Sequence, residues 1–114
     1  MGEASHPGPQ SITILCTNLT TAESGWMLVR GLPWQVGMFQ ETREEQAGVA
    51  RADARRAGWQ VVTGGEDETG RDLVWLVFKQ GAVSDSHLVH GPRLASAVWS
   101  PGGSVAVRLY CIYK

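Results

Sequence analysis

The chain has 114 residues, of which 43% are apolar and 18% are charged, and its formal net charge is −1. This length suits a single domain with its own core, and the apolar fraction excludes a wholly disordered chain. Ten basic against eleven acidic residues exclude the broad basic excess of many nucleic-acid-binding domains and the dense acidity of a DNA mimic. No stretch approaches the roughly 20 apolar residues that a membrane-spanning helix needs, so we expect no membrane partner.

Residues 1–10 predict a flexible N-terminal tail. Glycine and proline occupy four of these positions and large apolar residues are almost absent, so we place a single folded domain at residues 11–114. The tail has neither the basic start nor the apolar run of a secretory signal. Cys16 and Cys111 lie far apart in the sequence, unlike the dense cysteines of small secreted proteins. We therefore expect a cytoplasmic protein whose two thiols are reduced, buried and unreactive.

Two strands are expected before the helix. Residues 11–19 alternate in polarity, with Ile12 and Ile14 on one face, as a half-buried strand does. Residues 26–30 follow a turn-like segment and predict a second strand. The segment 34–39 fits either a strand or a loop.

The helix has the clearest sequence signals. Thr42 and Glu45 form a capping box, in which hydroxyl and carboxylate satisfy two backbone N–H groups at the helix start. Gly58 ends the helix, since glycine tolerates the positive φ of a C-terminal cap. One face carries alanines at spacings of three and four, namely Ala47, Ala50, Ala54 and Ala57.

The rest of the chain predicts β-structure. We expect four strands, at residues 59–63, 72–79, 93–100 and 104–113. The first two flank an acidic tip at residues 66–68 and form a hairpin, and the last two form a closing hairpin. Residues 73–78 are apolar on both faces, so this strand is expected to lie centrally, covered above and below.

The element order ββ(β)αββββ predicts an α+β fold in which one α-helix packs on one face of an antiparallel sheet of five or six strands. A helix is about 10 Å wide and strands lie about 4.8 Å apart, so one helix covers only two or three strands. The uncovered surface leaves some of the five tryptophans open to a partner. We expect this of Trp34, which follows Pro33, and of Trp99, next to the final turn.

Three arginines near the end of the helix form a second candidate contact for a partner. Arg51, Arg55 and Arg56 complement the negative end of the helix dipole. Arg51 and Arg55 lie one turn apart. The same cluster can bind phosphate or an acidic protein surface, and it is where nucleic-acid binding would reside.

A polar connector follows the central strand. Asp85, His87 and His90 are ligand types that zinc accepts, and Ser84 precedes them. Neither cysteine is close in sequence and no Gly-x-Ser-x-Gly elbow is present, so a solvated loop is the simpler interpretation. We predict no catalytic residue, no cofactor and no metal site.

The absence of a convincing nucleophile, metal cluster or cofactor loop, together with many tryptophans, predicts a small non-enzymatic binding protein that acts through protein–protein contacts. Proteins of this kind include inhibitors and accessory factors that phages or mobile elements direct at larger macromolecular machines. The alternatives are a small enzyme or metal-binding protein that uses Asp85, His87 and His90, and a nucleic-acid-binding module that uses the arginine cluster. The uncovered sheet is also compatible with a homodimer.

Overall fold

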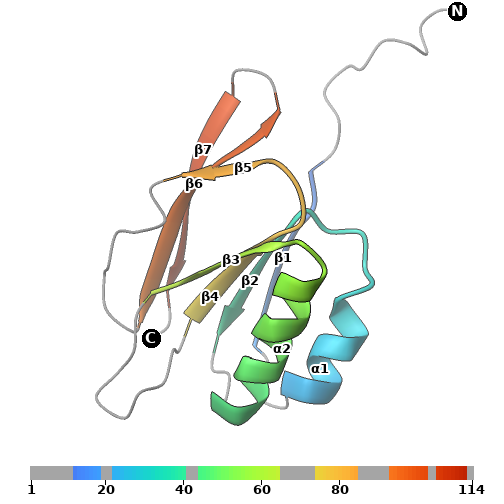
Figure 1. The fold of residues 1–114 in the computed structure, drawn as a ribbon. Coiled ribbons are helices and arrows are strands. Elements are labelled where there is room, and N and C mark those ends of the chain that lie inside the picture. The colour runs from blue at the N-terminus through green and yellow to red at the C-terminus, as the bar shows by residue number, and fades with distance from the viewer. Residues whose placement is uncertain are drawn as a thin grey trace, which may run out of the picture.

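The computed structural model describes residues 12–18, 22–40, 44–64, 74–84, 93–102 and 105–112. The elements in chain order are β1 (Ile14–Asn18), α1 (Ala22–Val29), β2 (Val36–Gln40), α2 (Glu44–Arg56), β3 (Gln60–Thr63), β4 (Val74–Phe78), β5 (Ala82–Ser84), β6 (Leu94–Gly102) and β7 (Val105–Ile112). They form three layers: the helices cover one face of a four-stranded sheet, and a three-stranded sheet covers the other face (Figure 1).

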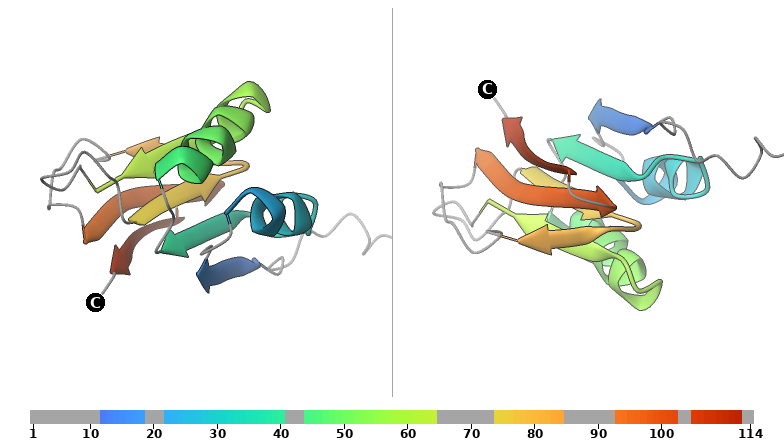
Figure 2. Two further views of the ribbon diagram at one scale, coloured as in Figure 1. Left: turned by 90° about the horizontal axis from the view of Figure 1, so that it is seen from below. Right: turned by 90° about the horizontal axis from the view of Figure 1, so that it is seen from above.

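The four-stranded sheet has the order β1-β2-β4-β3 and is mixed. β1 and β2 run parallel, and β4 is antiparallel to both β2 and β3. A parallel pair needs a crossover, and α1 supplies it between β1 and β2. The three-stranded sheet is antiparallel, with the order β5-β6-β7. Figure 2 shows α1 and α2 side by side on the same face of the larger sheet.

Strand β4 lies at the centre of the molecule, and all five of its residues are buried. Trp75 and Val77 face the helices, whereas Val74, Leu76 and Phe78 face the three-stranded sheet. Side chains alternate between the two faces of a strand, so a strand covered on both faces must be apolar throughout. The prediction of a central strand covered above and below is confirmed.

The expected single antiparallel sheet with one helix is wrong, although the α+β class holds. The structure has two sheets, and residues 26–30, expected as a strand, lie mainly in α1. Trp26 and Val29 are spaced one helical turn apart and pack against the same core. The extra helix and the separate sheet supply the cover that the expected fold lacked.

The predicted helix is present as α2, although Ala57 of its expected alanine face lies beyond the helix and is exposed. The expected cap residue Thr42 lies outside the described residues. Ala50 and Ala54 are buried against the sheet, and their small side chains let the helix approach it closely. Gly58 follows the helix with a φ of 85°, which only glycine adopts without strain. Residues 34–39, left open between strand and loop, contain most of β2. The expected antiparallel pairs β3–β4 and β6–β7 are both present, but they lie in different sheets.

Candidate functional site

The tryptophans mainly fill the interior: four of the five are buried and Trp59 is half-buried. Trp34 and Trp99 are each only 2% exposed, so the expectation that they lie open to a partner is wrong. The indole Nε1 of Trp34 donates a hydrogen bond to the carbonyl of Val29 at 2.7 Å, and that of Trp99 donates to the carbonyl of Gln80 at 2.8 Å. These bonds satisfy the buried N–H groups. Both residues therefore act as core side chains in this fold.

The helix-side core is an aromatic cluster. Trp26 lies at its centre, with ring centroids 6.4 Å from Trp34, 5.7 Å from Phe39 and 6.2 Å from Trp59. These three pairs meet edge to face, which is a favoured geometry for aromatic rings. The high tryptophan content of the sequence is thus explained largely by packing between α1, α2 and the larger sheet.

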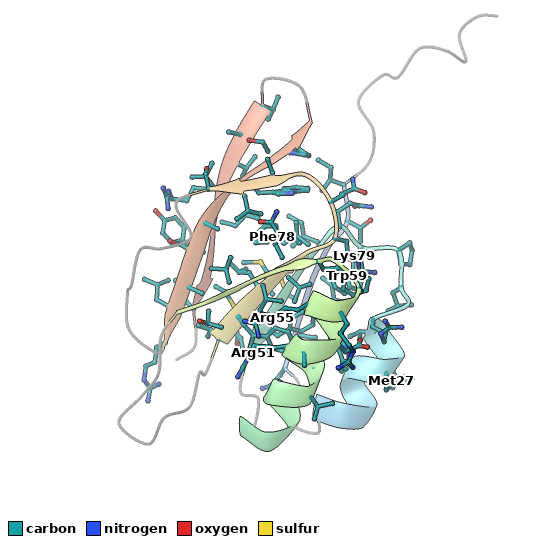
Figure 3. The ribbon with its side chains drawn as sticks, viewed as in Figure 1. Met27, Arg51, Arg55, Trp59, Phe78 and Lys79 are labelled. Atoms are coloured by element: carbon teal, nitrogen blue, oxygen red, sulfur yellow. The ribbon has the colours of Figure 1, made fainter. Side chains whose placement is uncertain are left out.

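The three helix arginines do not form one patch. Figure 3 shows Arg51 and Arg55 on the side of α2 away from α1 and Met27. Arg51 is buried, whereas Arg55 is exposed. Arg56 lies on the other side of the helix, where it lines a groove between α1 and α2. Only Arg56 of the predicted cluster therefore belongs to the candidate site.

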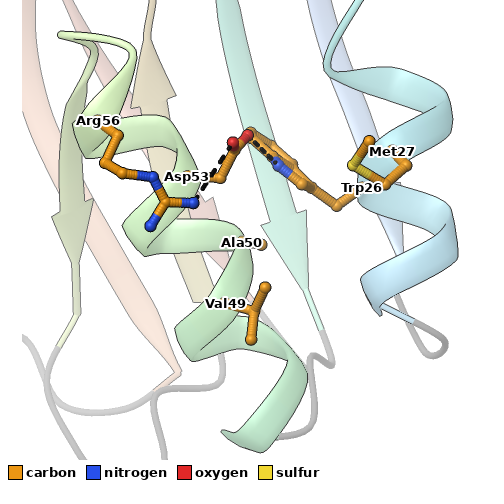
Figure 4. Close-up of a pocket in the computed structure, with 6 residues that line it drawn as sticks. All are labelled: Trp26, Met27, Val49, Ala50, Asp53 and Arg56. Carbon is orange, nitrogen blue, oxygen red and sulfur yellow. Dashed lines mark hydrogen bonds and ion pairs between the residues drawn. The ribbon is translucent and has the colours of Figure 1, made fainter.

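This groove, which we call the interhelix groove, is the candidate functional site. It has a volume of about 290 Å³ and is lined by Trp26, Met27, Val49, Ala50, Asp53 and Arg56 (Figure 4). Trp26 and Ala50 are buried, whereas Met27 is 63% and Val49 is 51% exposed. The groove therefore has two apolar walls that face solvent.

Asp53 organises the polar end of the interhelix groove. Its Oδ2 accepts hydrogen bonds from the Nε1 of Trp26 at 2.8 Å and from the Nε of Arg30 at 2.6 Å. Its Oδ1 lies 3.8 Å from the Nη2 of Arg56. The Trp26 hydrogen bond and the Arg30 guanidinium hold the pKa of the Asp53 carboxyl below its usual value, against the opposing effect of burial. Asp53 is therefore ionised at neutral pH.

Lys79 fixes the segment that carries Arg30. Its Nζ donates hydrogen bonds to the carbonyls of Arg30 at 2.9 Å and Leu32 at 2.7 Å. The same ammonium lies 3.9 Å from the ring centroid of Trp34 and 4.9 Å from that of Trp59. Burial and then the charge of Arg30 lower the pKa of Lys79. This clamp satisfies backbone carbonyls just beyond the end of α1 and so holds Arg30 beside Asp53.

Part of the groove could have been found from the sequence. Val49, Asp53 and Arg56 follow the helical spacing of i, i+4 and i+7, so they share one stripe of the predicted helix. Met27 and Trp26 could not be placed opposite this stripe, because their segment was expected to be a strand. The sequence therefore predicts the α2 wall of the groove but not the α1 wall.

The remaining predicted site residues lie elsewhere. Asp85, His87 and His90 fall outside the described residues, so the zinc alternative stays a prediction. Cys111 is buried as expected, but Cys16 is exposed, which corrects the expectation of two buried thiols. Within the described ranges, no group of three or more His, Cys, Asp or Glu side chains is placed to hold a metal ion.

Comparisons of the chain with protein-family models, with curated proteins and with solved structures give no match. Among the helices that the structure describes, none is long and apolar enough to cross a membrane.

Proposed function

We propose that the chain is a non-enzymatic binding protein that holds a segment of a partner protein in the interhelix groove. The observation that carries this proposal is the pair of exposed apolar walls, Met27 and Val49, beside a buried aromatic floor. An apolar side chain inserted between these walls would be shielded from water by Met27 and Val49, and desolvated apolar contacts of this kind are typical of binding hot spots.

The charges around the groove favour an acidic partner segment. Asp53 carries one negative charge, and Arg30 and Arg56 each carry a positive charge, so the polar end is cationic. Arg30 is engaged by Asp53 and lies 5.7 Å from the ring centroid of Trp59. The Arg56 side chain is 72% exposed and only loosely paired. It is therefore available to a carboxylate on the partner.

The proposed occupant is a segment in which apolar residues alternate with acidic ones. Such contacts suit an inhibitor or accessory factor of a larger macromolecular machine. A nucleic-acid surface on α2 has less support, because Arg51 is buried and Arg56 faces the groove. No described residue favours an enzymatic role.

Selection from a random peptide display library tests the proposal without assuming a partner. The wild-type chain should enrich peptides that combine apolar and acidic residues. Val49→Glu should abolish this enrichment, because it places a charge on the groove wall, and Arg56→Glu should shift it toward basic peptides. Val107→Glu changes a valine of similar exposure on β7 and serves as the matched control, which should leave the enrichment unchanged. Enrichment that Val49→Glu and Arg56→Glu leave unaltered would contradict the proposal.

A further inference from the structure

Strand β1 lies at the margin of the molecule with one open edge. In the described part of the chain it pairs only with β2. Figure 2 shows β1 at the outer side of the larger sheet, with α1 set back toward the sheet. β7 packs over β2 and β4, so the smaller sheet is set back as well. Among the described residues, neither neighbouring layer therefore lies over the open edge of β1.

The backbone of β1 is oriented for pairing at this edge. The carbonyl of Thr13 accepts a hydrogen bond from the N–H of Gln35 at 2.9 Å, so it points toward β2. Successive residues of a strand direct their N–H and C=O groups to opposite sides. Ile14 and Cys16 therefore direct theirs to the open edge. Their side chains lie on the same face as Val36 and Met38, which is the face that the smaller sheet packs on. They remain accessible there, because Ile14 is 43% exposed and Cys16 is exposed.

The sequence of β1 lacks the features that normally protect an edge strand. Natural edges use charged residues, proline, bulges or very short strands to prevent pairing with other chains. β1 is five residues long and contains neither a charge nor a proline. In the smaller sheet, by contrast, edge strand β5 has three residues and edge strand β7 carries Arg108.

We propose that β1 pairs antiparallel with β1 of a second copy of this chain about a two-fold axis, which joins two four-stranded sheets into one sheet of eight strands. A second copy of β1 fits this edge because β1 carries no charge, so two β1 strands can pair without placing like charges opposite each other. A two-fold axis also makes every contact twice. This inference is independent of the interhelix groove.

The register of the pairing follows from the open-edge residues. With Cys16 on the two-fold axis, Ile14 lies opposite Asn18 of the second copy, and Leu15 lies opposite Thr17. The backbone groups of Cys16 point to the open edge, so the two Cys16 residues form a hydrogen-bonded pair with Cα atoms about 5.5 Å apart. That separation is within the range that a disulfide spans. Mild oxidation by a thiol-specific oxidant would then join the two thiols, with loss of two protons and two electrons to the oxidant.

Light scattering coupled to gel filtration tests the dimer under reducing conditions. The full chain should have twice the monomer mass and dissociate on dilution. Ile14→Lys should give the monomer mass at every concentration, because a charge on this edge opposes pairing. Tyr110→Lys changes a side chain of similar exposure on β7 and should leave the dimer intact.

Oxidative cross-linking tests the register. Oxidation of the wild-type dimer should give a covalent dimer whose linked peptides contain Cys16 from both copies, and Cys16→Ser should abolish it. A monomeric wild-type chain would overturn the proposal. So would a dimer that Tyr110→Lys disrupts and Ile14→Lys spares, or a dimer in which no Cys16–Cys16 link forms.

Discussion

Replacement of Asp53 by alanine should destabilise the fold mainly through Trp26. The indole N–H of Trp26 donates to Asp53 at 2.8 Å, and Trp26 is buried, so Asp53→Ala leaves this donor without its partner. An unsatisfied buried donor costs about 1–3 kcal/mol. The ion pair with Arg30 is partly exposed and adds about 0.2–1 kcal/mol. Asp53→Ala should therefore lower the free energy of unfolding by about 1–4 kcal/mol.

A double-mutant cycle separates these two contributions. Trp26→Phe removes the N–H while keeping an aromatic ring, so in that background Asp53→Ala should cost only the Arg30 contribution. The coupling free energy between the two positions should be about 1–3 kcal/mol. Urea unfolding followed by circular dichroism measures all four free energies. An Asp53→Ala cost that is the same with Trp26 and with Phe at position 26 would refute the reasoning.

Further predictions concern pH, the buried thiol and two glycines. The pKa of Asp53 is lowered in the fold, so its ionised form stabilises the protein above the ordinary carboxyl pKa of about 3.9. The difference in unfolding free energy between wild type and Asp53→Asn should therefore shrink when the pH falls below that value. A difference that does not change with pH in urea titrations would contradict this. Burial raises the pKa of the Cys111 thiol to about 11. In the Cys16→Ser variant, where Cys111 is the only cysteine, a thiol reagent should therefore modify Cys111 only after unfolding. Rapid labelling of the folded variant would contradict this prediction. A Cβ at Gly37 would lie 2.5 Å from the Phe39 ring, so Gly37→Ala should cost about 1–3 kcal/mol in thermal unfolding. Gly48→Ala meets nothing within 4 Å in a helix and should instead stabilise by about 0.5–1 kcal/mol.

The sequence predicts the elements whose signals are local. Helix α2 was expected because its cap, its alanine face and Gly58 agree with one another. Strand β4 was expected because residues 74–78 are apolar on both faces, and this pattern by itself requires cover on two sides. Both features depend on neighbours within a few residues along the chain, so no knowledge of the tertiary contacts was needed.

The elements that the sequence missed depend on distant contacts. The apolar segment around Trp26 has eight helical residues, too few for periodicity to separate a helix from a strand. Its state is set by packing against α2 and by the hydrogen bond to Asp53, which lies 27 residues away. The division of the strands into two sheets is likewise set by pairing between distant segments. The groove could not be assembled from sequence because one of its two walls was assigned to the wrong kind of element.

The most direct test of the proposed function is a magnetic resonance titration that observes the indole N–H of Trp26 at the floor of the interhelix groove. Two amphipathic peptides are compared, one with leucine and glutamate and one with lysine in place of glutamate. The acidic peptide should shift the Trp26 indole resonance in a saturable manner, and Val49→Glu should abolish this shift. Equal shifts with both peptides, or shifts confined to residues outside the groove, would contradict the assignment of this groove as an acidic-segment binding site.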